Sequence, residues 1–255
     1  MAKQRGLGYA AAVAGGTVLA GPYVQPPWLM ALVIIFFALV LWRFFDTKYL
    51  AYVFCILSAL YAVNLLPFVV LATTLAMMAL GELVFQTGAD DLNTYFYYVI
   101  STAWAGILVM VYLHEQTFLM VVFGIIAAVL LKVILLKFED SLVLEGIGIA
   151  MTMYLIKELN YTVDIEIVIV AVAIAFVFGY FAFRAKTADL SGLFSIALVG
   201  VILLVFADAT WLLVMLAFFI LGSVCTRYKF EYKKRIGVEQ GQSGARGYRN
   251  VFANG

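Results

Sequence analysis

The chain has 255 residues, of which 66% are hydrophobic and 12% charged, with a formal net charge of +1 at pH 7 and a mean hydropathy of +1.07. Soluble domains carry about 25% charged residues, so this composition excludes a soluble globular fold. It is typical of an integral membrane protein, whose apolar surface is covered by the lipid bilayer.

Apolar segments follow one another from Leu7 to Cys225, interrupted by short polar breaks. Backbone groups in lipid must bond within their own segment and strand alternation is absent, so each segment is predicted to be a helix. We therefore expect an all-α, polytopic transmembrane helical bundle of about ten helices. The predicted segments are about 8–20, 28–45, 49–65, 67–86, 95–113, 117–136, 141–159, 165–183, 190–206 and 210–226.

Two predicted segments allow a second interpretation. The first is short, and Lys3, Arg5 and Ala20 also resemble the ends of a signal peptide. The Gly-Pro and Pro-Pro pairs that follow favour a retained helix, because they form a tight turn into the next segment. The third and fourth segments are separated only by residues 64–67, so a single re-entrant hairpin is the alternative to two full spans.

The basic residues orient this predicted bundle. If the N-terminus is cytoplasmic and the segments alternate in direction, all of the 16 Lys and Arg residues except Lys157 lie on the inner side, counting Lys132 as reaching water from its helix end. We therefore predict cytoplasmic termini and a multi-pass protein of the cell membrane. The expected partner is the lipid bilayer and not nucleic acid, and homo-oligomerisation is left open.

Carboxylates at the ends of predicted spans suggest a metal site. Glu82, Asp140, Glu145 and Asp189 all face the cytoplasmic side on this topology. Such carboxylates are candidate ligands of a divalent cation beside a nucleotide. For each residue taken alone, contact with water or pairing with a nearby Lys or Arg is the simpler interpretation.

The tail after the tenth segment is basic and rich in glycine. Its residues 233–235 suit anionic lipid headgroups. Farther along, Gly244 and the neighbouring glycines allow backbone N–H groups to converge on an anion, and Arg246 and Arg249 can form bidentate contacts with phosphate. The tail lacks the Gly-Lys-Ser/Thr ending of a Walker A motif, and a flexible solvated loop would have a similar composition.

Several motifs in the last quarter of the chain carry a family resemblance. They are Ser191-Gly192, Phe218-Phe219, Gly222-Ser223, the stretch from Thr226 to Lys229, the Gly-Ala-Arg stretch ending at Arg246, and the closing stretch from Val251 to Gly255. In these motifs the chain resembles the domain shared by plastid phytyl-phosphate kinases and their archaeal, bacterial and animal membrane relatives. We accordingly divide the chain into 1–189, a region of about eight helices, and 190–255, the start of the kinase-like domain.

The resemblance implies a nucleotide-dependent kinase, or part of one, that acts on isoprenoid or polyprenyl phosphates. Mg²⁺ and a nucleoside triphosphate, CTP among them, are its implied cofactors. It makes these residues candidates for binding phosphate or nucleotide: Lys229, Gly244, Arg246, Arg249, Asn250 and Asn254.

No catalytic base is assigned by this resemblance. In the family, further helices with an Asp-Thr and Ser-Glu motif follow the Ala-Asn-Gly motif, and no equivalent stands upstream here. A fragment, a separate partner half and a chain without kinase activity therefore stay open. The alternative functions are a transporter or flippase, and a non-catalytic membrane scaffold.

Overall fold

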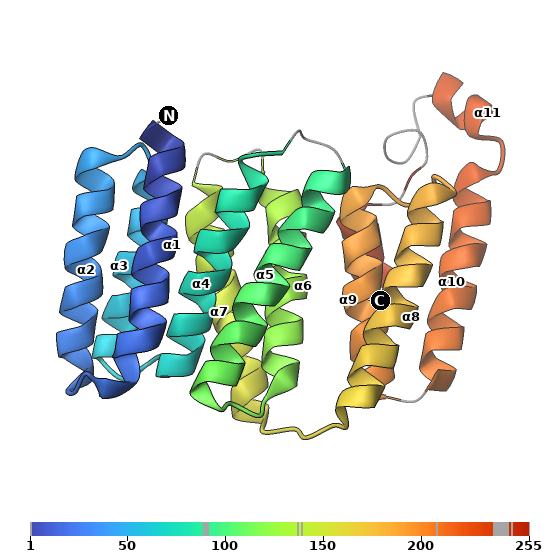
Figure 1. Cartoon of the computed structure of the whole chain (residues 1–255). Helices are drawn as coiled ribbons and strands as arrows, with labels where there is room; N and C mark the ends of the chain where they lie inside the picture. Colours follow the sequence, from blue (N-terminus) through green and yellow to red (C-terminus); the bar gives the residue numbers. More distant parts are fainter. Residues whose placement is uncertain are drawn as a thin grey trace. The chain divides into compact units, whose positions relative to one another are not determined.

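The computed structural model describes residues 2–88, 92–136, 138, 140–207, 209–236, 245 and 247–254. The chain divides into two compact units, unit 1 (Met1–Thr162) and unit 2 (Val163–Gly255). The described residues form helices joined by short loops and contain no β-strand (Figure 1). The all-α fold predicted from the sequence is confirmed.

Unit 1 contains the first seven long helices. Figure 1 shows that consecutive helices run antiparallel, so the starts of α1, α3, α5 and α7 lie at the same end of the unit as the ends of α2, α4 and α6. The elements are α1 (Ala2–Ala20), the short 3₁₀-helix η1 (Gly21–Tyr23), α2 (Pro27–Phe44), α3 (Lys48–Ala62), α4 (Phe68–Phe85), α5 (Leu92–Leu113), α6 (Phe118–Leu135) and α7 (Ser141–Leu159).

The described residues of unit 2 form three long helices and two short ones. The end of α8, the start of α9 and the end of α10 share one end of this unit (Figure 1). The bounds are α8 (Ile165–Arg184), α9 (Leu190–Phe206), α10 (Ala209–Arg227), α11 (Phe230–Arg235) and α12 (Tyr248–Asn254). The two units are separated between residues 162 and 163 because each packs mainly against itself. The boundary predicted between residues 189 and 190 instead marks where the family motifs begin in the sequence. That boundary stays a prediction.

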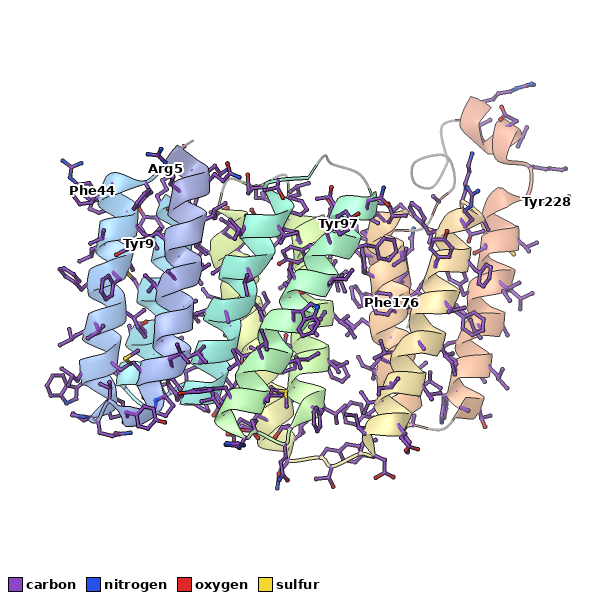
Figure 2. All side chains as sticks on the ribbon, viewed as in Figure 1. Arg5, Tyr9, Phe44, Tyr97, Phe176 and Tyr228 are labelled. Atoms are coloured by element: carbon purple, nitrogen blue, oxygen red, sulfur yellow. The ribbon has the colours of Figure 1, made fainter. Side chains whose placement is uncertain are left out.

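Exposed apolar side chains cover the helix surfaces, as expected of a protein in lipid. Phe44, Tyr97 and Tyr228, labelled in Figure 2, are examples of large side chains that no protein neighbour buries. Within the described part of the chain, α2, α4, α5, α6 and α8 are each long and apolar enough to cross a membrane. The protein is therefore an integral membrane protein, whereas ten full crossings and cytoplasmic termini stay predictions.

Helix α4 is the most buried of these five candidate spans. Small residues allow its neighbours to approach: a Cβ added to Gly81 would lie 2.7 Å from the Tyr98 ring on α5. The Thr73 and Thr74 hydroxyls donate to the carbonyls of Val69 and Val70, so α4 buries no unsatisfied threonine. This central helix positions the polar cluster of unit 1 described below.

Candidate functional site

Asp189 fixes the start of α9 in unit 2. Its Oδ1 accepts hydrogen bonds from the Gly192 N–H at 2.8 Å and from the Ser191 hydroxyl at 2.7 Å, which is an N-cap. The Tyr248 N–H at the start of α12 donates to the Ser191 hydroxyl at 3.0 Å. A Cβ at Gly247 would lie 2.8 Å from Asp189 Oδ2. The C-terminal helix is therefore docked on the beginning of α9.

A pocket of about 380 Å³ lies between α8, α9 and α10. Its walls are almost entirely aliphatic and aromatic, and the α10 wall extends from Leu212 to Val224, roughly 18 Å along the helix axis. The polar members of the lining are Thr187, Ser223 and Asn250. They lie where α8 and α10 end and where α12 docks, so the pocket has one polar end and an apolar interior.

The polar groups at this end differ in what they contact. The Thr187 hydroxyl donates to the Ala182 carbonyl at 2.8 Å, and the Ser223 hydroxyl donates to the Phe219 carbonyl at 2.7 Å. Asn250 belongs to the tail motif, the stretch from Arg246 to Asn254 whose polar residues are predicted to bind phosphate or nucleotide. Docking of α12 places Asn250 on the pocket wall.

The other predicted phosphate-binding residues stand as follows. Lys229 and Arg249 are exposed and are not among the residues that line the pocket. Lys229 has a left-handed backbone, with φ of 50°, in the link between α10 and α11, and the Arg249 Nε donates to the Tyr248 hydroxyl at 3.2 Å. Asn254 ends α12, and its side chain, like all of Gly244 and Arg246, lies outside what the structure describes.

Unit 1 contains a buried polar cluster to which four helices contribute, three of them with a charged side chain. The Lys132 ammonium on α6 contacts Glu82 Oε1 on α4 and lies 3.3 Å from Glu145 Oε2 on α7. The Tyr98 hydroxyl on α5 donates to Glu145 Oε1, and Gln86 Nε2 donates to Glu82 Oε2 at 3.2 Å. Glu82, Lys132 and Glu145 are only 1%, 4% and 0% exposed.

This cluster joins two of the four predicted metal ligands, Glu82 and Glu145, through an ammonium group. Lys132 does not reach water from its helix end as expected, because the two carboxylates hold it inside the bundle. The Phe85 and Tyr98 rings lie 4.7 and 5.5 Å from its Nζ, which adds cation–π stabilisation.

The two remaining metal candidates lie at helix starts. Asp140 precedes α7 and its side chain makes no cap hydrogen bond, whereas Asp189 caps α9. Among the described residues, no three Asp, Glu, His or Cys side chains converge in a way that could hold a metal ion. Divalent-cation binding stays a prediction.

The C-terminal third of the chain matches a known protein family. No curated protein and no solved structure matches the chain. The matching family is described as an integral membrane protein family, which agrees with the exposed apolar surfaces of the helices. The match starts within α8 and includes the whole segment that carried the resemblance in the sequence. The protein is an integral membrane protein whose residues 173–255 match the family described as "Integral membrane protein DUF92".

Proposed function

We propose that unit 2 binds an isoprenoid or polyprenyl phosphate and that the protein is a nucleotide-dependent kinase, or part of one, acting on that lipid. The observation that carries this proposal is the apolar pocket between α8, α9 and α10, with Asn250 of the tail motif at its polar end. Ligand pockets of this kind are mostly apolar and contain a few placed polar groups. The hydrocarbon chain would occupy the interior and the phosphate would lie at the polar end.

The cations near the polar end of the pocket suit a phosphate group. Arg184 is the last residue of α8, and Lys186 follows two residues later. Lys229 follows α10 at the same end of the unit. Arg249 lies beside Asn250 on α12. Lys and Arg neutralise the charge of phosphate oxygens, and phosphoryl transfer depends mainly on such positioning and neutralisation. The kinase-like motifs of the tail support the nucleotide as the second substrate.

Mg²⁺ belongs to this proposal through the family resemblance. The described carboxylate of Asp189 already accepts two hydrogen bonds from the start of α9, and its second oxygen faces the Gly247 backbone. The described residues of unit 2 therefore do not by themselves form a magnesium site. Mg²⁺ is commonly bound through one or two carboxylates together with substrate phosphates, so the nucleotide would have to supply ligands of its own.

Binding can be tested by filling the pocket. Leu216 on α10 lines the pocket, whereas Leu213 on the same helix is exposed and does not. Leu216→Trp should displace about four methylenes of a bound chain at about 0.8 kcal/mol each, which corresponds to a roughly 200-fold weaker affinity for a fluorescent polyprenyl phosphate. Leu213→Trp is the matched control. Equal affinity of both variants would show that the chain does not occupy this pocket.

Transfer needs its own assay. The full chain in nanodiscs is incubated with polyprenyl phosphate and each γ-labelled nucleoside triphosphate, and labelled polyprenyl diphosphate is the expected product. Arg249→Ala should lower the rate more than it weakens lipid binding, because the apolar interior of the pocket still holds the hydrocarbon chain. Tight lipid binding without transfer from any nucleotide would overturn the kinase proposal while leaving the lipid site intact.

A transporter or flippase is the second candidate, and the buried ion cluster of unit 1 favours it. Charged residues inside membrane spans often mark a transport path. Glu145→Gln preserves the shape of the side chain while removing its charge. Lipid or ion flux into proteoliposomes that this variant abolishes, without a matching loss of folded protein, would support transport.

A further inference from the structure

A second pocket, of about 350 Å³, lies within unit 1. The starts of α1, α3 and α7 and the ends of α4 and α6 enclose it. It is far more polar than the pocket of unit 2, and Glu82 and Lys132 form part of its wall. The charged and polar groups that matter for its ligand are Lys3, Asp46, Thr47, Lys48, Glu82 and Lys132.

Two helices begin at this pocket. The first residues of α3, from Lys48 to Leu50, and the first residues of α7, Ser141 and Leu142, line it. The first turn of a helix presents N–H groups without intrahelical partners and carries partial positive charge, which favours anions. The Ser141 N–H already donates to the Phe138 carbonyl, so α7 contributes mainly its dipole and α3 supplies the donors.

Thr47 gives an independent indication of a ligand. It occupies the N-cap position of α3, where a threonine hydroxyl normally accepts a hydrogen bond from the first turn, but its side chain makes no cap. The residue is only 7% exposed, it lines the pocket, and its Oγ1 has no hydrogen-bond partner among the described residues. A buried hydroxyl without a partner costs free energy, which a ligand oxygen would recover.

The charges of the lining favour an anion at the start of α3. Lys132 and Glu82 form the floor, where Lys132 is shared with the buried Glu145. The exposed side chains of Lys3 and Lys48 contribute two further positive charges, and Asp46 contributes one negative charge. At the start of α3 itself, these two cations and the partial positive charge of the helix start outweigh the one carboxylate.

We propose that this pocket binds a phosphate group, held by the first-turn N–H groups of α3, the Thr47 hydroxyl, Lys48 and Lys3. A phosphate offers several acceptor oxygens and up to two charges, which suits this number of donors and cations. The group can belong to a lipid headgroup or to a soluble phosphate compound. This site lies wholly in unit 1 and does not depend on the lipid-kinase proposal, which concerns the pocket of unit 2.

The test uses the full chain in phosphatidylcholine nanodiscs. In one arm, inorganic phosphate is titrated and its binding is followed by calorimetry. In the other arm, the nanodiscs contain phosphatidic acid, and native mass spectrometry counts the retained lipid. Binding in the first arm identifies a soluble phosphate, and binding in the second arm alone identifies a lipid headgroup.

Variants show whether the bound phosphate occupies this pocket. Thr47→Val and Lys48→Ala should each weaken binding roughly tenfold, as expected for hydrogen bonds to a charged group. Thr17→Val is the matched control, because Thr17 is a buried threonine on α1 whose hydroxyl already donates to the Val13 carbonyl. Asp46→Asn should tighten binding several-fold, a direction that misfolding cannot produce. Absence of binding in both arms, or Thr47→Val and Lys48→Ala variants that bind as the wild type does, would overturn the proposal.

Discussion

Replacing Lys132 with methionine tests what holds unit 1 together. Methionine has a similar length and keeps the apolar contacts with Phe85 and Tyr98, but it removes the ammonium group that lies between Glu82 and Glu145. Both carboxylates then stay buried without their cation. Removing one partner of a buried pair costs about 3–5 kcal/mol, so we expect the free energy of unfolding to fall by about that amount.

Equilibrium unfolding in mixed detergent micelles measures this loss, and a rescue separates charge from packing. The triple variant Glu82→Gln, Lys132→Met and Glu145→Gln contains no buried charge at the cluster, so it should regain most of the lost stability. Lys157→Met is the matched control. Lys157 lies 2.5 Å from Glu115 in a partly exposed pair, whose loss should cost less than about 1 kcal/mol.

Two results would refute this reasoning. A loss of less than about 1 kcal/mol for Lys132→Met would mean that the carboxylates do not need the ammonium group. A triple variant no more stable than the single one would mean that shape, and not charge balance, decides the stability of the cluster.

Three further changes test other contacts by unfolding measurements. Gly81→Ala should cost about 1–3 kcal/mol because its Cβ meets the Tyr98 ring, whereas Gly15→Ala, with open space around its Cβ, should be neutral or slightly stabilising. Burial raises the pKa of Glu115, but hydrogen bonds, first from Lys157, outweigh it and place the pKa below its ordinary value. The stability due to this carboxylate is fully present above its unfolded pKa of about 4.3 and is lost as the pH falls through the lower folded pKa. The free energy of unfolding of Glu115→Gln should therefore decrease less on acidification than that of the wild type. Asp189→Ala should cost about 1 kcal/mol through loss of the α9 cap, and Asp189→Asn should retain most of it.

The helices were predictable from the sequence because their signal is local. The predicted segment 141–159 coincides with α7, and 67–86 differs from α4 by one residue at each end. Apolar length and polar breaks suffice for this, since lipid leaves the backbone no other way to satisfy its hydrogen bonds. The short helices α11 and α12 within the basic tail were not predicted, because neither has an apolar stretch of span length.

The ion cluster was only partly visible in the sequence. The sequence identifies Glu82 and Glu145 as carboxylates at span ends and predicts that Lys132 reaches water. The alternation of helices already placed all three at the same end of their spans, which was the available signal. Their contact additionally requires that α4, α6 and α7 be neighbours in the bundle. That arrangement depends on packing between residues 13 to 63 positions apart, and no local sequence pattern reveals it.

The pocket of unit 2 shows how one glycine connects the sequence motifs to a site. The sequence suggested that the tail glycines favour anion binding, but the structure gives Gly247 a packing role: a Cβ there would lie 2.8 Å from Asp189 Oδ2, so the carboxylate that caps α9 would have to shift. Because Gly247 lets the chain lie against the capped start of α9, the Tyr248 N–H can reach Ser191 and α12 can dock. Docking in turn places Asn250 on the pocket wall. The conformation of the tail thus depends on a contact with α9, and the chemistry that it brings to the pocket depends on residues of α12. A solvated loop with the same composition would lack that contact. Composition alone therefore could not distinguish a solvated loop from part of a binding site.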